Sequence, residues 1–306
     1  MKRKRAITLQ FRYMRRAIRR AGQSLRYGRH ALNHTPVFFA NSFPKSGTHL
    51  LTQVMQGFTR CGPAVNSGLP AIVTFEGDTG RQRLESEILA DLHRLLPGDI
   101  AYGHLHSSAG IAAALCRDGV VPYFILRDPR DVVVSHVHYL TEMAQDHVYH
   151  RYFAQELKTF DERLRVSILG LSQESNSQRN LPAIHENQIS PAQSLPNIYA
   201  RFEPYLGWLD CPEVLTLHYE DFTAGRRAAL QLIFEHAVQR GFVSRYEPER
   251  AIAILADSIE PQRSPTFRSG KTGAWREAFS AENKRLFKEV AGGLLVQLDY
   301  EKDFNW

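Results

Sequence analysis

The sequence predicts an α/β protein with a central parallel sheet flanked by helices. Several short, continuously apolar segments are rich in β-branched and aromatic residues, which is the composition of strands buried on both faces. Segments with helical periodicity separate these strands, as the crossover connections of a parallel sheet require. Polar residues directly follow each strand, and such sheets bind ligands at that edge.

The predicted strands are residues 35–43, 99–106, 120–129 and 214–222. The predicted helices are residues 48–58, 81–96, 129–143, 226–239, 247–256 and 281–300. No internal repeat or linker composition interrupts the chain after residue 35, so residues 35–306 are expected to form a single domain. Residues 144–197 are polar and have no strand pattern, which predicts a loop over a site with at most a helix or two.

Residues 1–34 are predicted to be a separate, basic amphipathic arm. Residues 1–30 hold eleven of the 38 Lys and Arg residues and no acidic residue, so the rest of the chain has 27 basic and 32 acidic residues, a net charge of −5. The basic pI therefore belongs to the arm, and no nucleic-acid partner is expected. Apolar residues recur in the arm near helical spacing, with arginines between them. They are Ile7, Phe11, Met14, Ile18 and Leu25.

Two interpretations of the arm stay open. Residues 1–30 either make peripheral contact with an anionic membrane or a polyanionic partner, or form a solvated tail packed loosely on the domain. Mitochondrial targeting is a weaker third interpretation. The arm lacks the apolar core of a signal peptide, and no apolar run reaches about 18 residues. Three widely spaced cysteines predict no disulfide framework or zinc site, so we expect a cytoplasmic protein, with peripheral membrane contact left open.

The segment "FFANSFPKSGTHLL", residues 38–51, predicts an anion site. A buried strand ends there and a helix begins, and the first N–H groups of a helix have no intrahelical partner. Lys45 adds a full positive charge, and Gly47 lets the backbone approach a ligand closely. Ser46 and Thr48 add hydroxyl donors. The alternative is an ordinary turn in which a serine or threonine caps the helix.

The same segment is not a Walker A loop. That pattern is G-x-x-x-x-G-K-[ST], whereas Lys45 precedes Gly47 and no upstream glycine stands at the required spacing. A magnesium-dependent kinase or nucleotide hydrolase is therefore disfavoured.

Four segments together resemble the motifs of the cytosolic-type sulfotransferases, which use 3′-phosphoadenosine 5′-phosphosulfate (PAPS) as donor. They are "FPKSGTHLL" (43–51), "YFILRDPRDVVVSHVHY" (123–139), "HYEDF" (218–222) and "FRSGKTGAWREAFSAEN" (267–283). They occur in the order of the family and span most of the chain. The resemblance implies a P-loop-like sulfotransferase fold, PAPS as co-substrate and no metal.

The resemblance also implies roles for individual residues. Lys45, Ser46, Gly47, Thr48 and His49 would bind the 5′-phosphosulfate end of PAPS. Arg127, Ser135, Arg268, Ser269 and Gly270 would bind its 3′-phosphate, and Tyr219 would lie beside the adenine. The ammonium group of lysine is a mobile point charge, which suits the sulfuryl end of PAPS, and the planar guanidinium of arginine suits a terminal phosphate. The alternative for Arg127 is a surface salt bridge with Asp128 or Asp131.

A histidine base is expected in "AYGHLHSS", residues 101–108. Members of the family carry His-Leu-Pro after the corresponding strand, so His104 matches better than His106, which stands at the proline position. Strand alternation would place both side chains on the same face. The base would take the proton of the acceptor, and Lys45 would stabilise the leaving group.

Some positions depart from the family pattern and indicate a divergent member. Leu50, Tyr102, Ser269 and Ala274 stand where the family often has Trp, Lys, Lys and Asp. The acceptor stays open among a small molecule, a lipid and a glycan, and a homodimer is compatible with the sequence. Besides the disfavoured kinase, the alternative hypothesis is a non-catalytic binding protein that contacts membranes or polyanions through the arm and has a vestigial nucleotide site.

Overall fold

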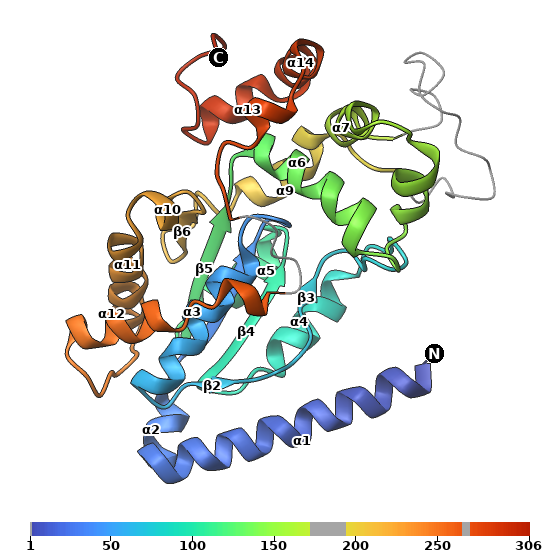
Figure 1. Cartoon of the computed structure of the whole chain (residues 1–306). Helices are drawn as coiled ribbons and strands as arrows, with labels where there is room; N and C mark the ends of the chain where they lie inside the picture. The colour runs from blue at the N-terminus through green and yellow to red at the C-terminus, as the bar shows by residue number, and fades with distance from the viewer. Residues whose placement is uncertain (1, 172–193, 265–269) are drawn as a thin grey trace. The chain divides into compact units, whose positions relative to one another are not determined.

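The computed structural model describes residues 2–171, 194–264 and 270–306, with side chains described from residue 8 onward. In this part of the chain six strands form one sheet in the order β2–β4–β1–β5–β6, with β3 also paired to β4, and every pairing is parallel (Figure 1). The strands are β1 (Val37–Ser42), β2 (Val65–Asn66), β3 (Ile72–Val73), β4 (Asp99–His104), β5 (Val120–Leu126) and β6 (Leu215–His218). The predicted α/β class is confirmed. The four predicted strands are present, and β2 and β3 were not predicted.

The α-helices are α1 (Lys2–Tyr27), α2 (Arg29–His34), α3 (Thr48–Cys61), α4 (Glu85–His93), α5 (Ala109–Cys116), α6 (Pro129–His138), α7 (Phe160–Leu169), α9 (Ile198–Leu206), α10 (Asp221–Ala224), α11 (Arg226–Gln239), α12 (Pro248–Asp257), α13 (Trp275–Ala278) and α14 (Ala281–Gln297). The helix predicted over 129–143 changes type within its length, because a π-helical segment, Tyr139–Met143, continues α6. The sequence did not predict α2, α5, α9, α10 and α13.

The chain divides into two compact units. The first contains Met1–Thr74, Leu84–Leu126 and Gly207–Phe267, and the second contains Phe75–Arg83, Arg127–Leu206 and Arg268–Trp306. The single domain over residues 35–306 stays a prediction, as does the boundary of the arm at residue 34.

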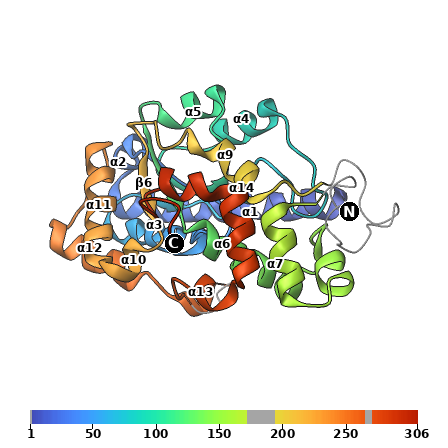
Figure 2. The ribbon, with the colours of Figure 1, turned by 90° about the horizontal axis from the view of Figure 1, so that it is seen from above.

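The first unit contains the sheet with helices on both faces. Successive residues of a strand point to opposite faces, so Phe38 and Ala40 of β1 enter one core. Helices α3, α11 and α12 close this core with Leu51, Phe58, Ile233 and Leu255, all fully buried. Figure 2 shows α4 and α5 on the other side of the sheet from α3, α11 and α12. Both faces of β1 are therefore covered, and its carboxyl end leads to the polar turn around Lys45.

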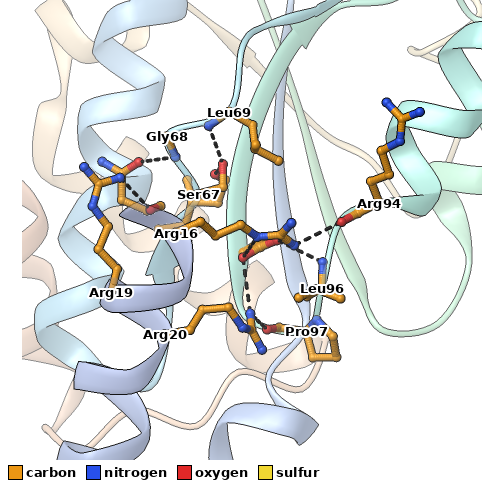
Figure 3. Close-up of polar contacts among 12 residues, drawn as sticks. Arg16, Arg19, Arg20, Ser67, Gly68, Leu69, Arg94, Leu96 and Pro97 are labelled. Atoms are coloured by element: carbon orange, nitrogen blue, oxygen red, sulfur yellow. Dashed lines mark hydrogen bonds and ion pairs between the residues drawn. The ribbon is translucent and has the colours of Figure 1, made fainter. Parts of the chain in front are cut away.

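Helix α1 packs on the first unit through its polar face. Arg16, which is 5% exposed, pairs with the fully buried carboxylate of Asp99 at the start of β4, and its Nη2 donates to the carbonyl of Arg94. Arg20 Nη1 lies 3.2 Å from Asp99 Oδ1 and donates to the carbonyl of Pro97. Figure 3 shows Arg16 and Arg20 reaching from α1 toward Arg94, Leu96 and Pro97. Buried pairing of this kind favours a docked helix over a loosely packed tail.

Replacing both Arg16 and Arg20 with methionine is expected to lower the free energy of unfolding by about 3 kcal/mol, because it leaves a buried carboxylate without its cations. Urea denaturation measures the loss. Arg15→Met is the control, because Arg15 is an exposed residue of the same helix and should change stability by less than about 0.5 kcal/mol. Equal stability of the double variant and the control would contradict the docking contact.

The second unit is built from helices in its described part. Helix α7 packs against α6 and α14, and α9 packs against α14. The guanidinium of Arg130 lies against the rings of both Trp275 and Trp306, 3.8 Å and 4.5 Å from their centroids. Asp128 and Glu301 pair with it, so the fully buried charge is compensated. This contact fixes the first turn of α6, directly after Arg127.

Candidate functional site

The turn after β1 has the backbone conformation of an anion site. Lys45 has a φ of 70° and Gly47 a φ of 101°, both in the left-handed region. Such conformations bring successive N–H groups to one side of a turn. Helix α3 begins at Thr48, and no side chain among the described residues caps its N-terminus. The capped turn, the alternative interpretation of this segment, is therefore not what forms.

Ser46 gives the most direct indication of a ligand. Its side chain is fully buried, and its Oγ has no hydrogen-bond partner in the described part of the chain. A buried hydroxyl left without a partner costs about 1–3 kcal/mol. A bound anion would accept this hydrogen bond, next to the positive charge of Lys45. The residues present therefore fit a phosphate or sulfate group.

Tyr219, the residue expected beside the adenine, packs against this turn. A Cβ added at Gly47 would lie 2.6 Å from Cδ2 of Tyr219 and 3.2 Å from Cδ1 of Ile125. Tyr219 also donates its N–H to the carbonyl of Leu126 at 2.8 Å, which extends the β5–β6 pairing by one step. Gly47 is thus required both by its φ and by the tyrosine ring.

Gly47→Ala is expected to destabilise the protein by about 2–4 kcal/mol, from the left-handed conformation and the clash with Tyr219 together. Gly241→Ala is the matched control, because Gly241 has a φ of 95° but no atom within 4 Å of an added Cβ. Gly241→Ala should lower the free energy of unfolding by only about 1–2 kcal/mol. Thermal unfolding measures both. Equal losses would contradict the packing of Tyr219 on the turn.

His104, at the end of β4, is held in one orientation by Ser42 of β1. Its Nδ1 lies 3.0 Å from the carbonyl oxygen of Ser42, which can only accept, so Nδ1 carries the hydrogen. The lone pair of the neutral ring is then on Nε2. The hydroxyl of Ser42 lies 2.7 Å from the hydroxyl of Thr48 and 3.1 Å from Nδ1 of His104. Ser42 therefore links the anion turn to the predicted base, a role that the sequence did not predict.

The surroundings of His104 favour a neutral imidazole. Burial lowers its pKa most, the hydrogen bond to Ser42 raises it, and the nearby positive charges of His49 and Lys45 lower it further. The pKa of His49 is lowered by burial and then by Lys45. Burial lowers the pKa of His106 to about 4. A neutral His104 at physiological pH can accept a proton.

The backbone after His104 is fixed by a buried amide. Asn41, one residue before Ser42, accepts from the N–H of Leu105 at 2.8 Å and donates to its carbonyl at 3.0 Å. Trp208 Nε1 donates to the same carbonyl at 2.7 Å. Because these bonds hold the residue that follows His104, Asn41 acts as a positioning residue. Its sequence signal is a polar side chain inside an apolar strand.

In the second unit, Arg127 is part of a buried network. Its Nη2 lies 3.2 Å from Oδ2 of Asp131 and donates to the carbonyl of Lys271 at 2.6 Å. Asp131 also accepts from the N–H groups of Gly273 and Trp275, at 2.7 and 3.0 Å. The ion pair proposed as the alternative for Arg127 exists, but it is buried. It joins Arg127 to the glycine-rich segment that the sequence singled out.

Ser135 lies one helical turn beyond Asp131 on α6, so the two side chains share a face. Gly270 has a φ of 67° and Gly273 a φ of 77°, so the segment has two left-handed glycines. The predicted 3′-phosphate residues Arg268 and Ser269 lie outside the described residues. The roles assigned to these residues stay predictions.

The chain has the fold of the sulfotransferases. No protein-family model matches the sequence, and no curated protein matches it significantly. Solved structures do match: mouse sulfotransferase SULT7A1 complexed with PAP has a TM-score of 0.53 and 16% identity, over 87% of this chain and 88% of that chain. Retinol dehydratase in complex with androsterone and inactive cofactor PAP has a TM-score of 0.54 and 14% identity, over 86% and 83%. Retinol dehydratase in a complex with retinol and PAP has a TM-score of 0.53 and 15% identity, over 87% of this chain and 84% of that chain.

Proposed function

We propose that the protein is a PAPS-dependent sulfotransferase that transfers a sulfuryl group to a hydroxyl, or an amine, of an acceptor. The observation that carries the proposal is the joining of an anion turn to an oriented, neutral histidine through Ser42, whose hydroxyl lies 2.7 Å from that of Thr48 and whose carbonyl accepts from Nδ1 of His104. The sulfotransferase fold and the order of the four motifs support the same conclusion.

The turn after β1 would hold the 5′ end of the donor. Lys45 supplies a full charge, Ser46 a buried hydroxyl, and the start of α3 its N–H groups. Gly47, Thr48 and His49 complete the predicted set. PAPS supplies an activated sulfuryl group whose departure leaves negative charge on the 5′-phosphate. Lys45 would stabilise that charge.

Arg127 would bind the 3′-phosphate, together with Ser135, Gly270, Arg268 and Ser269. Asp131 orients the guanidinium of Arg127, so part of the ordering cost is met before the nucleotide binds. Tyr219, which packs on Gly47, would contact the adenine side.

His104 would act as the general base. The hydrogen on Nδ1 is committed to the carbonyl of Ser42, so Nε2 is the atom that takes the proton of the acceptor hydroxyl. Proton removal makes the oxygen a better nucleophile as it attacks sulfur. After transfer the imidazolium would return its proton to solvent.

The proposed acceptor is a small apolar alcohol or phenol. Retinol and androsterone, the molecules bound in the two retinol dehydratase structures, each carry a hydroxyl on a hydrocarbon frame. A lipid or a glycan is the alternative. We propose a cytoplasmic enzyme, a compartment that fits the three free cysteines, Cys61, Cys116 and Cys211.

The test is transfer of labelled sulfur from PAPS to a library of alcohols, phenols and glycans. Transfer to at least one acceptor is expected, without added metal. Binding of adenosine 3′,5′-bisphosphate (PAP) with no transfer to any acceptor would favour the non-catalytic alternative. Failure to bind PAP, in a protein that is folded by circular dichroism, would refute the proposed function.

A further inference from the structure

Helix α1 exposes an apolar stripe. Phe11, Met14, Ile18 and Leu25 are spaced by three, four and seven residues and so lie on one helical face. Their side chains are 57%, 52%, 64% and 90% exposed. A surface helix normally turns such a stripe toward the core. Here the opposite occurs, and the stripe faces away from the unit that carries the helix.

The arginines of the opposite face explain this orientation. Arg16 and Arg20 bind Asp99, as described above, and Arg12 and Arg19 donate to the backbone carbonyls of Gly68 and Asn66. Gln23 and Tyr27 donate to the carbonyls of Thr59 and Arg60 in the same way. Polar contacts therefore run along the docked face from residue 12 to residue 27, and the apolar stripe is left outward.

Two arginine-lined hollows border helix α1. One, of about 410 Å³, is lined by Thr8, Phe11, Arg12, Arg15, Arg19 and Gly68. The other, of about 520 Å³, is lined by Arg26, Arg60, Tyr246, Arg250, Ala253, Ile254 and the single carboxylate of Asp257. Each hollow brings together three guanidinium groups, and guanidinium binds phosphate through paired hydrogen bonds. Both hollows thus border the side of α1 that carries Arg15 and Arg26, next to the stripe, and each is of a size that admits a lipid headgroup.

We propose that the outer face of α1 binds the surface of an anionic lipid bilayer. The apolar stripe would enter the boundary between headgroups and acyl chains, with the helix axis parallel to the membrane. The two hollows would receive the phosphates of anionic headgroups, with Arg15 and Arg26 nearest the stripe. No helix in the described part of the chain is long and apolar enough to cross a membrane, so the contact is peripheral.

The charge of the helix argues against a second copy of the chain as the occupant. Residues 1–30 contain eleven basic residues and no acidic residue. Two such helices packed stripe to stripe would bring the like charges that border the stripe, such as Arg15 and Arg26, toward one another, at a cost that increases as water is excluded. An anionic lipid surface supplies both the apolar layer and the opposite charge.

The experiment is sedimentation of the full chain with phosphatidylcholine vesicles, with and without phosphatidylserine. Binding is expected only with phosphatidylserine, and it should weaken as salt is raised. Phe11→Ser/Ile18→Ser should reduce binding by about tenfold or more. Leu232→Ser/Val243→Ser is the matched control, because both residues are exposed apolar side chains of the same unit, and it should leave binding unchanged.

The charged residues are tested separately. Arg15→Ala and Arg250→Ala should each weaken vesicle binding by about fivefold, whereas Arg117→Ala, at an exposed position at the end of α5 that lines neither hollow, should not. Deletion of α1 is not a clean test, because it removes the partners of the buried Asp99. Absence of vesicle binding by a folded protein would overturn the proposal. So would a concentration-dependent dimer that Phe11→Ser/Ile18→Ser abolishes, which would assign the stripe to a second copy.

Discussion

Replacing Lys45 with methionine is expected to lower kcat/KM for sulfuryl transfer by about 10²- to 10³-fold, the typical effect of removing one group that stabilises developing charge. Methionine keeps the length of the side chain and removes only the charge. The backbone cost of the positive φ at position 45 is similar for both residues, since neither is glycine. The change should therefore act on the reaction rather than on the fold.

Two readouts separate this effect from a general loss of structure. Thermal unfolding of Lys45→Met should be close to that of the parent, and Lys45→Arg, which keeps the charge, should retain part of the activity. The charge of Lys45 also lowers the pKa of His104, so the pKa of His104 should rise in Lys45→Met. Nuclear magnetic resonance titration of the histidines measures that shift. A fully active Lys45→Met protein would contradict the assigned role.

His104→Gln is expected to lower kcat/KM by about 10²- to 10⁴-fold, because glutamine cannot accept the proton of the acceptor. In the parent protein, log kcat/KM should rise with pH and reach a plateau, because only neutral His104 is active. Since burial lowers the pKa of His104, the rise should be centred below the ordinary histidine value of about 6.5. This rise with pH should be absent from the residual activity of His104→Gln.

The same shift predicts how stability depends on pH. The lowered pKa values mean that the unfolded chain binds more protons at His104 and His49 than the folded chain does below about pH 6.5. The contribution of these histidines is therefore fully present above that pH and is lost as pH falls through the folded-state pKa values. The difference in Tm between pH 7.5 and pH 5 should be smaller in His104→Gln than in the parent protein.

His106→Gln serves as the control for the choice of base. His106 is close in sequence, but its pKa of about 4 makes it a weaker base at neutral pH, and its backbone N–H bonds to Thr74. We expect less than about a tenfold loss of activity. A larger loss in His106→Gln than in His104→Gln would assign the base to His106.

The elements that the sequence predicted correctly share one property, a regular pattern over several residues. The four long strands and the helix after Gly47 have such patterns, and the sulfotransferase fold is confirmed. Strands β2 and β3 have two residues each, too short for any period to appear. The helix at residues 109–116 has little hydrophobic asymmetry, because it is apolar almost all round.

The parts of the site that sequence reasoning missed are contacts between distant segments. The hydroxyl of Ser42 and the amide of Asn41 act on residues more than 60 positions away, and nothing local marks those partners. Asp131 was considered only as a surface partner of Arg127, at the i,i+4 spacing of an ion pair. Its bonds to Gly273 and Trp275 depend on tertiary structure. The docked face of α1 likewise depends on Asp99, which the sequence shows only as the first residue of a strand.

The central claim is that separate groups bind the two phosphates of one nucleotide. Calorimetry with PAP, adenosine 5′-phosphate and adenosine 3′-phosphate tests it directly. Lys45→Met should weaken the binding of PAP and of adenosine 5′-phosphate by about tenfold or more and leave the binding of adenosine 3′-phosphate unchanged. Arg127→Lys keeps the charge beside Asp131 but loses the paired donors of the guanidinium. It should weaken the binding of PAP and of adenosine 3′-phosphate by about tenfold and leave the binding of adenosine 5′-phosphate unchanged. If either variant weakened all three ligands equally, or none of them, the assignment of the two phosphates would be wrong.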